Sequence, residues 1–316
     1  MQPFLSICIP TYNGKAFLEY NINKFIKLNE KYDFEVCVSD NASTDETQKF
    51  MIDIISKYDF IKYNRNEQNF GMAYNFDMAL KMANGEYRWL LGDDDEIIEE
   101  KFEKILNVLK KEKVEIIVIN SPDINGKGQF IKNVRSQKFN ERNKVLGAIA
   151  CQMSWISSCI LSEKVIKNLN IKNVNDNIFP HLIEILKYLE KSCNIYWIEE
   201  VCARIQHQSK CRYSEKILEY CLKDWCEIIE KIEGYDGKAK LKFVRSTPLI
   251  KYSNFINLLR YKKENILNLK TLKKISPYLK YYPFSLRVKF YIAQLFPRFL
   301  LKFLAKVKYE MKAMAK

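Results

Sequence analysis

The sequence of 316 residues predicts an α/β protein with a mostly parallel central sheet, followed by a helical C-terminal region. Over the first 120 residues or so, short apolar runs alternate with stretches of helical periodicity, and beyond about residue 214 the pattern is nearly all helical. We expect one domain over residues 1–210, with parts at 1–120 and 121–210, and a separate helical region over 211–316.

Each expected strand is a short apolar run that ends at polar or turn residues. In chain order these runs are Phe4–Pro10, Phe34–Ser39, Phe60–Tyr63, Tyr87–Leu91, Val114–Ile119, Ser154–Leu161 and Ile195–Ile198. The expected helices carry apolar residues three and four positions apart. They are Ala16–Leu28, Ser43–Lys57, Met72–Ala83, a helix from about Glu99, and Phe179–Leu189. Ser43–Glu46 (S-x-x-E) predicts a capping box for the second helix, and Gly85 is a stop signal after the third.

Polar clusters follow three of the expected strands: Thr11–Asn13, Asp40–Asn41 and Asp93–Asp95. Any one of them is also typical of an ordinary turn. In open parallel sheets, however, ligands bind outside the carboxyl ends of the strands. We therefore expect all three clusters to line one edge of the sheet and to form a ligand site there.

The acidic triplet Asp93–Asp95 suits a divalent cation. Mg²⁺ or Mn²⁺ takes one or two carboxylates and completes its coordination with water and phosphate oxygens, so a metal-bridged nucleotide diphosphate fits such a turn. The alternative is a solvated acidic turn ahead of the Glu99 helix.

Several other site types are excluded by missing motifs. The sequence has no GxxxxGK[ST] loop, no GxGxxG, no GxSxG and no HExxH. It also contains only two histidines, His181 and His207, which excludes a histidine-rich metal site.

Five segments, in this order and spacing, resemble the signature of family 2 glycosyltransferases: Ile9–Asn13, Val38–Asp45, Asn69–Gly71, Gly85–Tyr87 and Leu91–Asp95. The Leu-Gly-Asp-Asp-Asp form, together with Phe179–His181, resembles the subgroup of abequosyltransferase-like enzymes. The resemblance implies a GT-A fold and inverting transfer of a sugar from a UDP-, GDP- or dTDP-linked donor, with Mn²⁺ or Mg²⁺ as cofactor.

The same resemblance implies roles for individual residues. Thr11 and Tyr12 would flank the nucleobase, Asp40 would hydrogen-bond it, and Asp93 would lie near the ribose. The full expected nucleotide site is Thr11, Tyr12, Asn13, Asp40, Asn69, Gly71 and Asp93. Asp94 is the first candidate for the metal ligand and Asp95 the second.

Inverting transfer needs a general base for the acceptor hydroxyl. The family supplies it just before a helix, where this chain has Asn175-Asp176, so Asp176 is the candidate base. The alternative is that Asp176 caps the following helix. His181 is the fallback base, or else a packed helix histidine.

Two further groups match regions of the family. Arg204 and His207 resemble an R-x-x-H region that reaches the diphosphate or the metal; the alternative for Arg204 is an ordinary surface pair. Trp155, Ser157 and His181 are candidates for the acceptor pocket, although a buried core Trp155 is equally compatible with the sequence.

The net charge of +14 is unevenly distributed. Residues 238–316 hold 20 Lys and Arg against two acidic residues, a net charge of +18, whereas residues 1–237 carry −4. Basic helical segments with apolar stripes and many aromatics, at Ser285–Phe296 and Arg298–Met311, predict contact with an anionic membrane surface. A packed annex or an oligomer contact is the alternative.

We expect a cytoplasmic protein, peripheral at the inner face of the membrane. No signal peptide and no apolar run of about 20 residues is evident, and nine scattered cysteines without a CxxC pair indicate reduced thiols.

The leading hypothesis is a metal-dependent glycosyltransferase acting on a glycan or lipid-linked glycan in bacterial surface polysaccharide, lipooligosaccharide or glycoprotein glycan synthesis. The alternatives are a sugar nucleotidyltransferase and a nucleic-acid-binding protein using the basic tail; we expect no nucleic-acid partner. The oligomeric state is left open.

Overall fold

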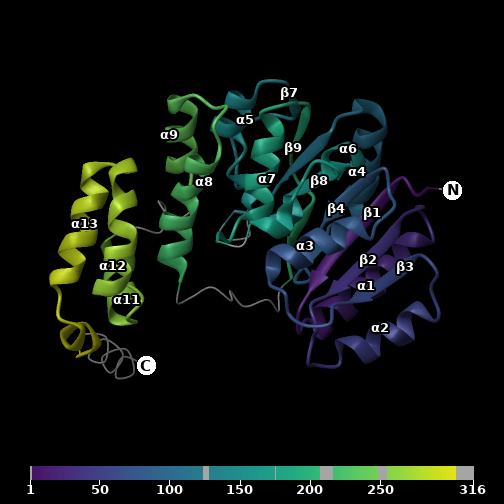
Figure 1. Ribbon diagram of the computed structural model, residues 1–316, viewed down its shortest axis with the longest axis horizontal. Coiled ribbons are helices and arrows are strands. Elements are labelled where there is room, and N and C mark those ends of the chain that lie inside the picture. Colours follow the sequence, from purple (N-terminus) through teal and green to yellow (C-terminus); the bar gives the residue numbers. More distant parts are fainter. Residues whose placement is uncertain (1, 124–127, 175, 207–215, 248–254, 304–316) are drawn as a thin grey trace, which may run out of the picture. The chain divides into compact units, whose positions relative to one another are not determined.

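The computed structural model describes residues 2–123, 128–174, 176–206, 216–247 and 255–303 (Figure 1). The chain divides into two units, Met1–Ser209 and Lys210–Lys316. Each unit has its own secondary structure and its own buried residues.

The first unit contains an eight-stranded sheet in the order β3-β2-β1-β4-β8-β6-β9-β7. Its strands are β1 Leu5–Thr11, β2 Glu35–Asp40, β3 Ile61–Arg65, β4 Tyr87–Leu90, β6 Ile116–Asn120, β7 Gln137–Phe139, β8 Cys159–Ser162 and β9 Ile195–Val201. β1 to β4 pair in parallel, as do β6 and β9, whereas β7 and β8 are antiparallel to their neighbours. Two short strands, β5 Asp95–Ile97 and β10 Ala203–Ile205, form a separate antiparallel pair. The predicted mostly parallel sheet is confirmed.

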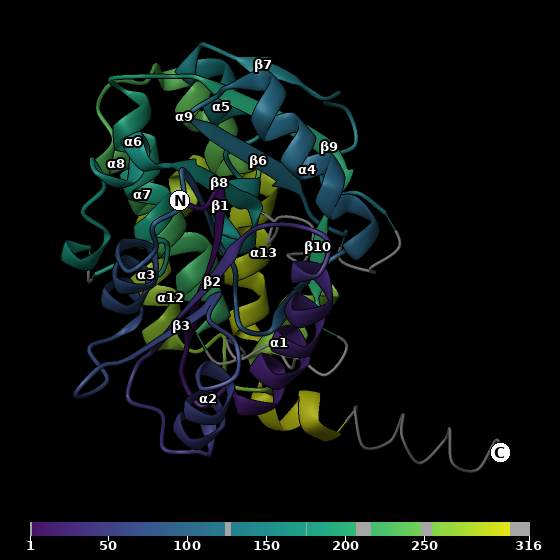
Figure 2. The same cartoon turned by 90° about the vertical axis from the view of Figure 1, so that its right-hand side faces the viewer.

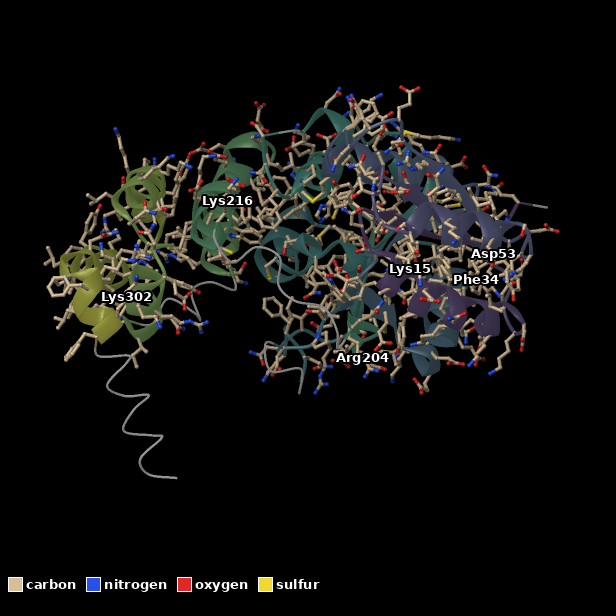
Figure 3. All side chains as sticks on the ribbon, turned by 90° about the horizontal axis from the view of Figure 1, so that it is seen from below. Lys15, Phe34, Asp53, Arg204, Lys216 and Lys302 are labelled. Carbon is tan, nitrogen blue, oxygen red and sulfur yellow. The ribbon has the colours of Figure 1, made fainter. Side chains whose placement is uncertain are left out.

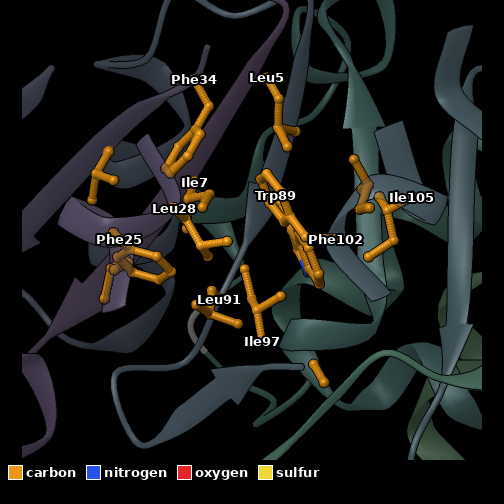
Figure 4. Close-up of a cluster of buried hydrophobic side chains, with 14 of the residues drawn as sticks. Leu5, Ile7, Phe25, Leu28, Phe34, Trp89, Leu91, Ile97, Phe102 and Ile105 are labelled. Carbon is orange, nitrogen blue, oxygen red and sulfur yellow. The ribbon is translucent and has the colours of Figure 1, made fainter. Parts of the chain in front are cut away.

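Helices cover both faces of this sheet. They are α1 Lys15–Asn29, α2 Thr47–Ile55, α3 Met72–Lys81, α4 Glu99–Glu112, α5 Arg142–Ala148, α6 Glu163–Ile166 and α7 Pro180–Leu189. Figure 2 shows α1 and α3 on opposite sides of β2. Alternate residues of β1 therefore face different helices: Leu5 and Ile7 join the core with Phe25 and Phe102 (Figure 4), while Cys8 is buried on the other face.

Two expected elements differ from the structure. The predicted capping box at Ser43–Glu46 is wrong: α2 begins at Thr47, and the Ser43 hydroxyl, which in such a box accepts from a backbone N–H of the helix, instead accepts from Asn13 N–H and donates to Asp40 Oδ1. The expected strand Ser154–Leu161 is shorter, because two 3₁₀ turns, Gln152–Ser154 and Ile156–Ser158, precede β8. In both places, side-chain hydrogen bonds satisfy polar groups that the local pattern assigned to regular structure.

In the described residues of the second unit, all regular secondary structure is helical, as predicted. It contains a π-helix at Glu219–Asp224, a 3₁₀ helix at Ser276–Tyr281, and α8 Trp225–Lys231, α9 Gly237–Arg245, α11 Phe255–Lys263, α12 Leu269–Ile275 and α13 Phe284–Leu295. The Trp225 and Phe243 rings stack with centroids 4.4 Å apart and anchor its core. The helix expected at Arg298–Met311 is seen from 298 to 303, and its remainder lies outside the described residues. Within the described residues, no helix has both the length and the hydropathy needed to span a membrane.

Candidate active site

The three polar clusters meet at one edge of the sheet, as predicted. Thr11, at the end of β1, donates from Oγ1 to Asp93 Oδ2 at 2.7 Å, and its carbonyl accepts from the backbone N–H of Asn41 at 3.0 Å. Since β1 lies between β2 and β4, the carboxyl ends of these parallel strands bring together residues 82 positions apart.

Gly14 makes this junction sterically feasible. A Cβ at this position would lie 2.1 Å from Asp93 Oδ2 and 2.6 Å from Thr11 Oγ1. Its φ of −113° is open to any residue, so the constraint is space and not backbone conformation. The sequence assigned Gly14 no role, because the crowding depends on side chains from two other elements.

Asp40 shapes the loop that follows β2. Its carboxylate is fully buried: Oδ1 accepts from the backbone N–H and hydroxyl of Ser43, and Oδ2 accepts from Tyr63 at 2.7 Å. Arg65 Nε lies 3.7 Å from the same oxygen. A direct bond from Asp40 to a nucleobase therefore stays a prediction, and the structure gives this carboxylate a set of partners within the fold.

The loops after β1 and β2 are tied to each other through Asn13. Its Oδ1 accepts from Thr44 N at 2.7 Å, and its own backbone N–H donates to Ser43 Oγ at 2.9 Å. Asn13 and Ala42 both adopt left-handed backbone conformations, with φ of 54° and 61°. Non-glycine residues held in this region cluster at functional sites, and here they lie in the two loops that follow β1 and β2, the first of which carries the exposed ring of Tyr12.

An asparagine cluster attaches the Asn69–Gly71 segment to the same edge. Asn41 Nδ2 donates to Asn69 Oδ1 at 2.8 Å and to the Gly71 carbonyl at 3.1 Å. Asn66 Nδ2 donates to Asn41 Oδ1, and Asn75 Nδ2, on α3, donates to the Thr11 carbonyl. Sequence reasoning missed Asn66 and Asn75, whose only signal was the recurrence of asparagine around the Asn69–Gly71 motif.

Two side-chain amides hold the acidic turn through its backbone carbonyls. Asn21 Nδ2 donates to the carbonyls of Asp93 and Asp95 at 3.1 and 2.7 Å, and Gln206 Nε2 donates to the Asp93 carbonyl at 3.2 Å. The backbone N–H of Gln206 donates to the Asp94 carbonyl at 2.9 Å. These bonds fix the backbone of the turn without using its carboxylates.

The three carboxylates of the turn differ in burial. Asp95 is buried, and its Oδ2 accepts from Trp155 Nε1 at 2.7 Å and from the Ser157 hydroxyl. Burial, reinforced by the charges of Asp94 and Asp93, raises the pKa of Asp95 to about 8 against the effect of these two hydrogen bonds. Asp93 is buried beneath Thr11, and Asp94 is the most exposed of the three.

Trp155 and Ser157 thus meet the acidic turn. Ser157 Oγ also accepts from the backbone N–H of Gly92 at 2.8 Å, and Trp155 packs partly buried against the core. Their part in an acceptor pocket stays a prediction.

The residues of the turn fit a divalent cation that arrives with phosphate ligands. Asp94 offers a partly exposed carboxylate, and oxygen is the donor that Mg²⁺ and Mn²⁺ prefer. Around no point of the described chain do three or more His, Cys, Asp or Glu side chains gather as a ready metal site. This donor set therefore suits a metal whose coordination is completed by a diphosphate and water.

Arg204 has a carboxylate partner. It lies on β10, and its Nε donates to Glu96 Oε1 of β5 at 2.6 Å. Burial acts to raise the pKa of Glu96, but hydrogen bonds from Tyr20, Arg204 and Lys24 hold it at about 2. The Arg204 side chain is still half-exposed, and its contact with a diphosphate stays a prediction. His207 lies outside the described residues.

The two candidate bases occupy different environments. Asp176 is exposed in the segment before α7, and the N-cap residue of α7 is Phe179, not Asp176; Asn177 Oδ1 accepts from Phe179 N at 2.9 Å. His181 is buried on α7, its Nε2 lies 3.0 Å from the Met153 carbonyl, and burial lowers its pKa to about 4. The packed-helix alternative for His181 is the one observed, and the roles of both residues in catalysis or acceptor binding stay predictions. Asn175 lies outside the described residues.

The chain is similar to known glycosyltransferases. The chain is 48% identical over 95 residues to abequosyltransferase RfbV of Salmonella typhimurium, covering 29% of this chain and 28% of that protein. It is 38% identical over 99 residues to GalNAc(5)-diNAcBac-PP-undecaprenol beta-1,3-glucosyltransferase of Campylobacter jejuni, covering 31% of each. The chain thus matches less than a third of the length of either relative.

Among solved structures, Staphylococcus aureus TarS in complex with UDP-GlcNAc is similar with a TM-score of 0.62 at 16% identity, covering 90% of this chain and 83% of that one. This likeness confirms the predicted GT-A fold. The model of glycosyl transferase family 2 matches residues 6–169, which contain all the strand ends that build the site. Since that match extends over more than half of its length, the chain belongs to glycosyl transferase family 2.

Proposed function

We propose that this protein transfers a sugar from a nucleotide diphosphate donor to a glycan or lipid-linked glycan, with inversion and with Mn²⁺ or Mg²⁺ as cofactor, in the synthesis of a bacterial surface glycan. The observation that carries the proposal is the junction of Thr11 and Asp93 at the sheet edge, with Asp94 beside it as the most exposed carboxylate. The Salmonella and Campylobacter relatives support a glycan product, since both are named as glycosyltransferases.

The proposed donor site is preorganised by the chain itself. The asparagine cluster and Asn13 hold the loops that carry Tyr12 and Asn69 in place before any ligand binds. Asn21 and Gln206 hold the backbone around Asp94, so the turn that carries its carboxylate does not have to be ordered when the donor arrives. A bound divalent cation would supply charge neutralisation at the leaving diphosphate.

The acceptor side depends on Asp176. Its exposed position ahead of α7 leaves it accessible to an incoming hydroxyl, whose proton it would take as the sugar is transferred. The Campylobacter relative supports a lipid-linked acceptor, because its name specifies an undecaprenol-linked glycan.

A panel of UDP-, GDP- and dTDP-sugars, each with and without Mn²⁺, tests the proposal through thermal stabilisation and donor hydrolysis. Asp94→Asn should remove the metal-dependent part of donor stabilisation. Asp176→Asn should keep donor stabilisation and lose turnover. Asp53→Asn, at an exposed residue of α2 paired only with Lys57 at the surface, is the matched control and should resemble wild type. Retained turnover in Asp176→Asn would exclude it as the base, and a panel without any stabilising nucleotide sugar would contradict the function.

A further inference from the structure

Helix α13 carries two apolar faces on opposite sides. Leu286, Phe290 and Ala293 are buried and face the interior of the second unit, where α13 packs along α11 (Figure 1). At 3.6 residues per turn, the residues directly opposite are Phe284, Val288, Tyr291 and Leu295. These four, called the outward stripe, follow the i, i+4, i+7, i+11 spacing of a single helix face.

Three of the four side chains of the outward stripe are at least half exposed. Phe284 is 72% exposed, Tyr291 50% and Leu295 80%, while Val288 is half-buried. The short helix over 298–303 extends the apolar surface with Phe299, 75% exposed, and Phe303, 61% exposed. Contiguous exposed apolar surface ordinarily marks an interaction site, so this second face calls for a partner.

The charged side chains near the outward stripe are all cationic, and the other residues that border it, Ser285, Ile292 and Gln294, are uncharged. Arg287 and Lys289 lie on its two flanks, and Arg298 and Lys302 follow it (Figure 3 labels Lys302). The Arg287 guanidinium lies 5.5 Å from the Phe284 ring centroid, which places a positive charge directly beside the apolar surface. No acidic residue occurs between 284 and 303.

We propose that the outward stripe of α13 docks on an anionic lipid surface. An apolar strip bordered by Lys and Arg matches a bilayer interface, where the acyl region takes Phe and Leu and the headgroups take the cations. A second copy of this chain is disfavoured as the occupant because it would bring like charges together. Nucleic acid binds cations through its phosphates and leaves the exposed Phe284 and Leu295 without a counterpart. The use of this surface to reach a lipid-borne acceptor rests on the proposed function, but the binding itself does not.

Flotation of the full-length protein with vesicles tests the proposal, using phosphatidylcholine alone and equal parts of phosphatidylcholine and phosphatidylglycerol. The double variant Phe284→Ser/Leu295→Ser should weaken binding to the anionic vesicles about 100-fold, roughly tenfold per side chain. The control is Ile256→Ser/Leu269→Ser, two apolar residues of α11 and α12 that are 78% and 75% exposed but lie off the stripe. It should bind as wild type does. All four positions are exposed, so both variants should fold.

A charge variant separates lipid from other partners. Lys289→Gln/Lys302→Gln should lose about fivefold per cation on anionic vesicles and almost nothing on neutral ones. The proposal is overturned if wild type does not float, if both double variants lose binding equally, or if duplex DNA competes the protein off the vesicles. It is also overturned if the stripe variant shifts the protein from dimer to monomer in sedimentation while vesicle binding stays unchanged. Donor stabilisation is read separately, so failure of lipid binding does not imply failure of the sugar-transfer proposal.

Discussion

Gly14→Ala should damage the centre of the site without touching a charged group. The new methyl would lie 2.1 Å from Asp93 Oδ2, so Asp93 must move by about 1 Å or more to reach ordinary van der Waals separation. That movement breaks the 2.7 Å bond from Thr11 in a buried setting. Overpacking together with the lost hydrogen bond should lower the free energy of unfolding by about 2–4 kcal/mol.

Urea unfolding and calorimetric titration with a nucleotide sugar measure the two consequences. Gly14→Ala should unfold at lower urea and bind the donor more weakly, whereas Thr11→Val removes the hydrogen bond without crowding and should show a smaller effect. Gly237→Ala, at the start of α9 with no atom within 4 Å of its added Cβ, is the control and should be neutral or stabilising by about 0.5–1 kcal/mol. Wild-type stability and donor affinity in Gly14→Ala would mean that the contact between residue 14 and Asp93 does not constrain the site.

Three further variants test separate parts of the site. Burial lowers the pKa of His181 to about 4 in the folded protein, against about 6.5 in the unfolded chain. Between about pH 4 and 6.5, the unfolded chain therefore binds more protons than the folded protein. The free energy of unfolding should therefore fall by about 3 kcal/mol as pH drops from about 6.5 to 4, and His181→Gln should flatten that slope in urea titrations at several pH values; an unchanged slope contradicts this. Ser157→Ala leaves the Gly92 N–H and the Asp95 carboxyl short of a partner and should cost about 1–3 kcal/mol in thermal unfolding, so an unaltered melting curve would argue against the arrangement. Asn41→Ala severs the bonds to the loop before α3 and should speed proteolytic cleavage there, whereas equal cleavage rates would show that the loop is held by other contacts.

The site's location could be predicted from the sequence because strand ends are a local signal. Apolar runs mark the strands, and parallel pairing places their carboxyl ends at one edge of the sheet. The residues that follow these ends therefore lie near one another: Thr11, Asp40 and Asp93. The capping box failed because the Ser43 hydroxyl oxygen accepts from the backbone N–H of Asn13 while its hydrogen is donated to the buried carboxylate of Asp40. A local pattern cannot rank a helix terminus against a carboxylate that the fold brings in.

The residues that hold the acidic turn and Arg204 in place could not be predicted from the sequence. Asn21 and Gln206 hold the same turn from positions 185 residues apart, and neither belongs to a recognisable motif. The pairing of Arg204 with Glu96 depends on β5 and β10, which are three residues each and too short to show a periodic pattern. These contacts arise from tertiary packing, and no local propensity carries them.

Donor titration of wild type, Asp94→Asn and Asp53→Asn, with and without Mn²⁺, shows whether the strand ends form a cation-assisted nucleotide-sugar site. We expect Mn²⁺ to strengthen donor binding in wild type and in Asp53→Asn, and this gain to disappear in Asp94→Asn. An equal gain in all three proteins would contradict the role given to Asp94.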